Sequence, residues 1–119
     1  MKYILLILFS LMGFLITSAS ADCVNCNFDE KNLANITFKD QNLSYASFKG
    51  AYLVNADFTG ANLQGSNLSE SILVGTNLDN TNLQDTNLIN SIIVELTEGS
   101  MVQANLAGAN MAGLFGDVD

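Results

Sequence analysis

A large apolar residue recurs at every fifth position from Phe28 to Ile93, and this repeat constrains the fold more than any other feature of the chain. We call this residue the centre of its five-residue unit. The residue before each centre is most often Asn, and the one before that is usually Ala, Ser or Thr, as in ANLQG and TNLQD. On an α-helix five residues advance by about 500°, so the centres would form no stripe. On a flat strand an odd spacing sends alternate centres to opposite faces. The chain must therefore bend once in every unit so that all centres face one axis.

These units resemble the pentapeptide-repeat family, whose pattern is A(D/N)LXX with Leu or Phe at the centre. The resemblance covers Cys26 to Glu95, which makes fourteen consecutive units. It implies an all-β fold, a right-handed quadrilateral β-helix of about 3.5–4.5 coils, with four units in each coil and rungs about 4.8 Å apart. Residues twenty apart should then share a wall. This spacing places Phe28 over Phe48 and Phe38 over Phe58 on two opposite walls.

Residues 1–21 are typical of a secretory signal peptide. One Lys leads into a mostly apolar run, and small residues (ASA) form a cleavage site before Asp22. The run is short for a membrane span, which needs about twenty apolar residues. We therefore expect an exported protein, periplasmic or extracellular, that keeps no stable membrane span after the leader is removed. An uncleaved anchor is the alternative.

The repeat divides the mature chain into two parts. Residues 22–95 should form the β-helix. After Ile93 the next centre would be Glu98, which does not suit a core, whereas a reset to Leu96 restores the spacing. Residues 96–119 are therefore expected to form register-shifted final repeats and a C-terminal cap, since an open β edge invites aggregation.

The two cysteines, Cys23 and Cys26, lie at the start of the repeat and should both face the core at its open end. In an oxidising compartment they could form a disulfide that closes the first rung. Two buried thiols are the alternative. A zinc site would need further ligands, and the sequence has no His and no third Cys. Nothing around these residues resembles the strand-to-helix setting of a redox C-x-x-C motif.

Composition argues against several functions. The chain has 12 acidic and 4 basic residues and a net charge of −8, which disfavours direct nucleic-acid binding. No His is present to act as a general base, and no phosphate-binding or EF-hand motif appears. We therefore predict no enzymatic activity, no metal and no cofactor. Some members of the family imitate duplex DNA and inhibit a topoisomerase, which remains an alternative function, but those members act in the cytoplasm.

One wall departs from the repeat. The units AYLVN, SILVG and SIIVE recur at twenty-residue spacing, so their flanking residues should point outward in one column. This predicted interaction face consists of Tyr52, Val54, Ile72, Val74, Ile92 and Val94. Six such side chains would expose about 300–500 Å², the size at which an apolar patch usually has a use. We predict a non-catalytic scaffold that binds a protein partner or a second copy through this wall. Covering by the C-terminal segment and contact with a membrane surface are the alternatives.

Overall fold

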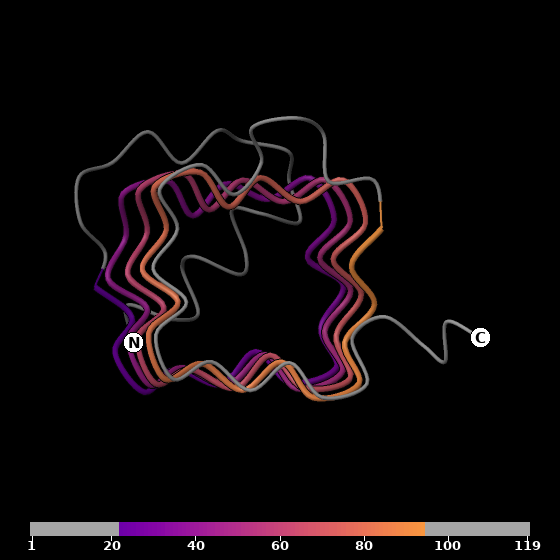
Figure 1. Ribbon diagram of the computed structural model, residues 1–119, viewed down its shortest axis with the longest axis horizontal. Helices are drawn as coiled ribbons and strands as arrows, with labels where there is room; N and C mark the ends of the chain where they lie inside the picture. The colour runs from indigo at the N-terminus through magenta and orange to yellow at the C-terminus, as the bar shows by residue number, and fades with distance from the viewer. Residues whose placement is uncertain (1–21, 95–119) are drawn as a thin grey trace.

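The computed structural model describes residues 22–94, which form a coil with a square cross-section (Figure 1). Within this range the chain has no helix and no extended strand; its rungs pair through single-residue parallel bridges between positions twenty apart. The bridged columns run Asn27–Ser47–Asn67–Asn87, Asn32–Tyr52–Ile72–Ile92, Thr37–Asp57–Asn77 and Asn42–Asn62–Asn82. The predicted leader and the predicted C-terminal cap lie outside the described residues, as does Glu95.

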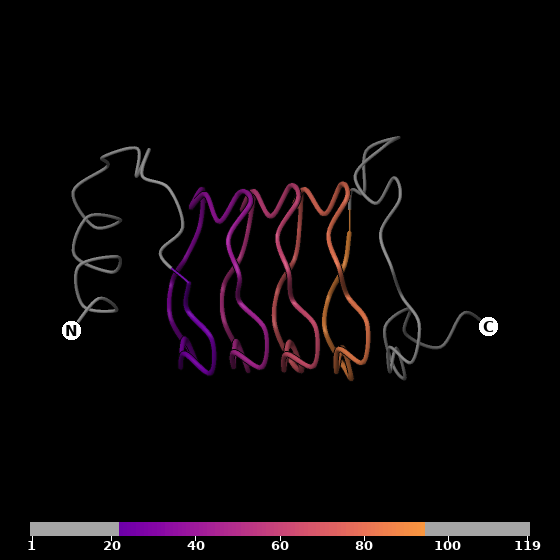
Figure 2. The same ribbon diagram turned by 90° about the vertical axis from the view of Figure 1, so that its left-hand side faces the viewer.

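Each wall is a stack of units from successive coils (Figures 1 and 2). The centres of these units are buried in the interior. We number the walls in chain order. Wall 1 has the centres Phe28, Phe48, Leu68 and Leu88, wall 2 has Leu33, Leu53, Leu73 and Ile93, wall 3 has Phe38, Phe58 and Leu78, and wall 4 has Cys23, Leu43, Leu63 and Leu83. The predicted interaction face lies on wall 2.

The corners explain how a five-residue unit turns through a right angle. In every unit from that of Cys23 to that of Leu88, the second residue after the centre has a positive φ, between 56° and 70°. This left-handed conformation suits Gly and is tolerated by Asn and Asp. A backbone hydrogen bond closes each turn, as from Ala61 N–H to the Phe58 carbonyl at 2.8 Å. Tyr45 is unusual among the corner residues because a bulky aromatic side chain rarely adopts this conformation.

Backbone hydrogen bonds join each coil to the next. The N–H of a centre donates to the residue before the centre one coil ahead, as from Phe48 to Asn67 at 2.7 Å. The corner N–H also donates forward, as from Gly50 to Ser69 at 2.9 Å. From Ser47 to Ile92, the N–H before each centre donates back to the preceding coil, so an inner coil is held from both sides.

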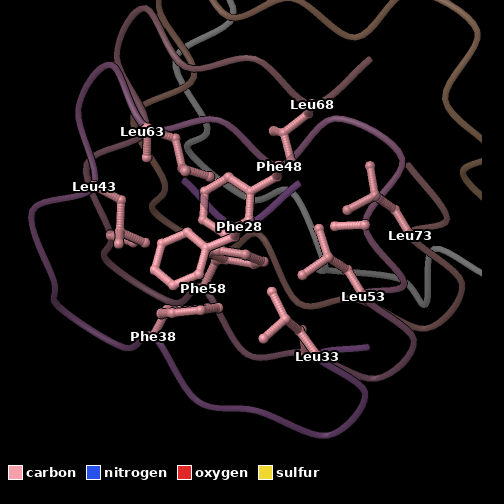
Figure 3. Packing of buried hydrophobic residues seen from close by; sticks show 14 of the residues in the cluster. Phe28, Leu33, Phe38, Leu43, Phe48, Leu53, Phe58, Leu63, Leu68 and Leu73 are labelled. Atoms are coloured by element: carbon pink, nitrogen blue, oxygen red, sulfur yellow. The ribbon is translucent and has the colours of Figure 1, made fainter. Parts of the chain in front are cut away.

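The interior begins with aromatic rings and continues with leucines (Figure 3). Phe28 stacks on Phe48 with ring centroids 4.8 Å apart, and Phe38 stacks on Phe58 at 5.0 Å. The two stacks come from opposite walls and meet edge to face, with centroids 5.5–5.8 Å apart. Offset stacking and edge-to-face packing are the arrangements that aromatic rings favour. This placement of the four rings follows the prediction from the sequence.

The small inward residue two positions before each centre changes along the coil. It is Ala at positions 46, 51, 56 and 61, and Ser or Thr from Ser66 onward. Three buried Thr hydroxyls donate to carbonyls of the preceding coil at 2.9–3.0 Å, for example Thr76 to Leu53. Ser71 and Ser91 instead bond within their own turns. These hydroxyls can be buried because each has an acceptor.

Candidate protein-binding wall

A unit with a described coil on either side has five backbone N–H groups, and the backbone provides acceptors for four of them, as in residues 46–50. The fifth belongs to the residue after the centre and has no backbone acceptor. A side chain usually accepts from it: the residue before the centre turns its oxygen onto the N–H two positions ahead. The capping residues are Asn27, Asn32, Asn42, Asp57, Asn62, Asn67, Asn77, Asn82 and Asn87 at 2.8–3.2 Å, with Thr37 at 3.4 Å. The frequent Asn of the repeat therefore completes the backbone hydrogen bonding.

Wall 2 lacks this cap in three successive coils. Because Tyr52, Ile72 and Ile92 precede the centres there, no side-chain oxygen reaches the following N–H. Among residues 22–94, the N–H groups of Val54 and Val74 have no hydrogen-bond partner, and neither has that of Val94. On wall 1, where Ser47 precedes the centre, the N–H of Lys49 is still capped, by Asp29 from the coil before at 2.9 Å. The departure of wall 2 is therefore both a gain of apolar side chains and a loss of hydrogen bonds.

All six residues of the predicted face lie on the outer side of wall 2, beside buried centres. Tyr52, Ile92 and Val94 are exposed, at 43%, 49% and 51% of their surface. Val54, Ile72 and Val74 are half-buried between neighbouring rungs. The bridges from Tyr52 to Ile72 and from Ile72 to Ile92 hold one column of the face in register.

The charges around this face are uneven. The structure describes wall 2 over residues 31–35, 51–55, 71–75 and 91–94. This part of the wall has no carboxylate, and its one charged residue is Lys31. The corner between walls 1 and 2 carries Glu30 and Glu70, and Glu70 lies 3.6 Å from the ammonium of Lys49. This exposed ion pair contributes little to stability. The corner between walls 2 and 3 carries only Asn35, Asn55 and Gly75 among the described residues.

The outer side of wall 4 is polar. Asn62 donates its amide to Asn42 at 3.2 Å, and Asn82 donates to Asn62 at 3.0 Å, so the amides form a ladder from coil to coil. Amide ladders of this kind stabilise stacked β structures. The three residues also cap their own units, which gives wall 4 a structural use for its polar column.

The cysteines lie at the N-terminal end of the described coil, and both are buried. Their sulfurs are joined, with the Cα atoms of Cys23 and Cys26 5.3 Å apart, in the range that a disulfide requires. Cys23 takes the position of a centre on wall 4, and Cys26 takes the small inward position of the next unit. A buried disulfide in this place closes the first rung and offers no exposed sulfur for exchange.

The sequence did not indicate the uncapped N–H groups, although the signal was present in Tyr52, Ile72 and Ile92, which replace Asn. It also missed two buried polar atoms. Among the described residues, Gln41 Oε1 and Ser66 Oγ are buried without a hydrogen-bond partner. Nothing in the structure explains either atom.

Within residues 22–94, no three His, Cys, Asp or Glu side chains come together as a metal site would require. The same range contains no helix with the length and apolar character of a membrane span.

Comparison with solved structures identifies similar folds. A pentapeptide repeat protein from the Arabidopsis thaliana thylakoid lumen is 30% identical, with a TM-score of 0.63, over 83% of this chain and 70% of that one. HetL, a pentapeptide repeat protein involved in heterocyst differentiation regulation in Nostoc, is 20% identical with a TM-score of 0.46, over 81% of this chain and 46% of HetL. A second Nostoc pentapeptide repeat protein is 20% identical with a TM-score of 0.44, over 85% of this chain and 93% of its own.

The similar Arabidopsis thaliana structure confirms the predicted right-handed quadrilateral β-helix. No curated protein matches the sequence. The family model that describes the pentapeptide repeat region matches residues 19–88, more than half of the chain. The coil has four units per turn and its centres are buried, as the repeat requires. Because the family model also matches more than half of the sequence, the chain belongs to the pentapeptide repeat family.

Proposed function

We propose that the chain is a non-catalytic, exported scaffold that binds a protein through the outer face of wall 2. One observation carries this proposal: three successive coils replace the capping residue with Tyr or Ile. Each replacement forfeits a hydrogen bond, which typically contributes about 0.5–1.5 kcal/mol, so stability of the coil does not account for it. β-branched residues favour extended backbone, but that preference does not explain their restriction to one wall. A wall that gives up stability and gains exposed apolar surface is suited to binding.

The shape and size of the wall support a protein as the ligand. Small molecules bind mostly in concave sites, whereas this face is one flat side of a square coil (Figure 1). The apolar face offers roughly 300–500 Å² of surface without an acidic side chain among its described residues. Pentapeptide repeat proteins are generally non-catalytic, which agrees with a binding role.

Two features support an exported location. Residues 1–21 have the pattern of a signal peptide. The similar Arabidopsis thaliana protein is found in the thylakoid lumen, which is reached by export across a membrane. Fractionation of a C-terminally tagged copy should place it outside the cytoplasm. Its intact mass should be that of a chain that begins at or near Asp22. A cytoplasmic, full-length product would contradict export and favour the alternative role as a DNA-mimicking inhibitor.

Site-specific photo-crosslinking tests the binding wall. A photo-reactive residue is placed at Val54 on wall 2 or, as a control of similar burial, at Gln84 on wall 4. In the native host we expect a discrete adduct from position 54 and none from position 84. A second change, Ile72→Asn, should abolish the adduct at 54 while the circular dichroism spectrum stays that of the wild type. Equal adducts from both walls, or none from wall 2, would overturn the proposal.

A further inference from the structure

We propose that the protein bound to wall 2 is a second copy of this chain, packed wall 2 to wall 2 about a two-fold axis parallel to the coil axis. This inference rests on the proposed function, because both require the apolar face. It adds the identity of the partner, the symmetry of the complex and a role for the Tyr52 hydroxyl.

Charge restricts how two copies can meet. Over its full length the chain carries a net charge of −8, so copies repel one another unless they approach through a wall free of acid. Walls 1, 3 and 4 each carry a carboxylate outside, for example Asp29, Asp57 and Asp85. The described part of wall 2 carries none. Wall 2 is thus the side on which a second copy meets both apolar surface and the least repulsion.

The two corners beside wall 2 distinguish the possible symmetry axes. A two-fold axis parallel to the rungs would bring the corner with Glu30 and Glu70 against the same corner of the other copy. An axis parallel to the coil axis exchanges the corners, so that Glu70 faces a corner that carries Asn55 and Gly75. Like charges opposite one another are unfavourable, whereas amide groups can donate hydrogen bonds to a carboxylate. Electrostatics therefore favours the axis parallel to the coil.

The uncapped N–H of Val54 favours the same axis, whereas those of Val74 and Val94 would face Ile72 and Ile92, which offer no acceptor. With an axis parallel to the rungs, the column after the centres would face itself, so that N–H donors would oppose donors. With an axis parallel to the coil, this column faces the column before the centres in the other copy. Tyr52 then lies opposite Val54 of the second copy, and its hydroxyl is the one hydrogen-bond acceptor among the six side chains. By symmetry the contact occurs twice.

The interface is small. Two copies share the same rung spacing, so their apolar side chains can interdigitate in register over three coils. About 300–500 Å² per copy is less than the roughly 800 Å² per partner of a standard stable interface. We therefore expect a reversible dimer that depends on concentration. Since an isologous contact uses the same surface on both copies, association should end at two chains.

Sedimentation equilibrium of protein purified from exporting cells tests the dimer. From micromolar to millimolar concentration, the wild type should pass from monomer to dimer. Ile72→Asn should raise the dissociation constant by about tenfold or more, whereas Gln84→Asn on wall 4 should leave it unchanged. A wild type that stays monomeric throughout, or an Ile72→Asn protein that dimerises equally well, would overturn the inference. If wall 2 still crosslinked to a different protein, the proposed function would survive this failure.

Cysteine crosslinking tests the symmetry. Ile72→Cys and Val74→Cys proteins are prepared separately, mixed and oxidised. The axis parallel to the coil predicts that the mixed 72-to-74 disulfide forms faster than either 72-to-72 or 74-to-74. Faster formation of a like pair would overturn the proposed arrangement. The circular dichroism spectrum of each variant, compared with the wild type, shows that the coil is intact.

Discussion

The ring of Tyr45 lies against Gly65 at the same corner one coil further along, so closely that a Cβ atom added to Gly65 would come 2.5 Å from Cε1 of the ring. Gly65→Ala should therefore destabilise the protein twice over, through its positive φ of 65° and through this clash. We expect a loss of about 2–4 kcal/mol in urea denaturation. Gly50→Ala is the matched control, because Gly50 has the same φ and its nearest neighbour, Glu30 Cγ, is 3.6 Å away. Equal losses at the two sites would show that the tyrosine ring moves aside freely.

Two buried hydroxyls should respond differently to removal. Thr76→Val keeps the shape of the side chain but deletes the donor to the Leu53 carbonyl at 2.9 Å, which should cost about 0.5–1.5 kcal/mol. Ser66 is buried, and its hydroxyl has no partner among the described residues, so Ser66→Ala should be neutral or stabilising. Thermal denaturation of both variants measures the difference. A larger loss for Ser66→Ala would reveal an acceptor for its hydroxyl.

Asn62 should be among the most important surface residues. It caps the N–H of Gln64 at 3.1 Å and bonds to the amides above and below it in the ladder. Asn62→Ala is expected to cost about 1–3 kcal/mol in chemical denaturation. Gln64→Ala, on the same outer wall, should stay within about 0.5 kcal/mol because no hydrogen bond of its side chain is present among residues 22–94. Similar effects would mean that the amide ladder contributes nothing.

Restoring the missing cap on wall 2 should make an Ile72→Asn protein more stable than an Ile72→Ala protein. Ile72→Asn returns an oxygen acceptor to the N–H of Val74, whereas Ile72→Ala removes the same apolar side chain and restores nothing. We expect the Asn variant to be more stable than the Ala variant by about 0.5–1.5 kcal/mol. Melting curves at low protein concentration, below the range of association, provide the comparison. An Asn variant less stable than the Ala variant would show that this N–H is already satisfied.

The disulfide between Cys23 and Cys26 should protect both sulfurs from alkylation. Without reductant the mature protein should take up no thiol reagent, folded or unfolded, and two additions should appear after reduction. Because the bridge closes a short loop, its removal in a Cys23→Ser, Cys26→Ser protein should cost only about 2 kcal/mol. Two additions to unfolded, unreduced protein would show free thiols, and the first rung would then depend on packing alone.

The sequence predicted the architecture because a period of five leaves a chain few ways to bury its apolar residues. The inward positions of Leu63 and Leu73 and the paired Phe stacks followed from the repeat and its twenty-residue spacing. The outward position of the six residues on wall 2 also followed, whereas what they bind stays a prediction.

Other features depend on atomic distances that the pattern does not contain. Ser69 occupies an outward position of the repeat but is buried. The contact of Tyr45 with Gly65 requires the corner residues of two coils to be placed together. The missing caps on wall 2 depend on which acceptor each N–H group reaches, which the repeat pattern does not specify.

The corner at every fifth residue has a consequence for how such a chain can change length. A duplication or deletion of twenty residues adds or removes a whole coil and keeps every column on its own wall. A change of five residues keeps the centres buried but rotates everything that follows by a quarter turn. Ile72 and Ile92 would then leave the wall of Tyr52, and the apolar face would be divided between two sides of the square. Natural variants that keep this face should therefore differ in length, between Tyr52 and Val94, by multiples of twenty residues.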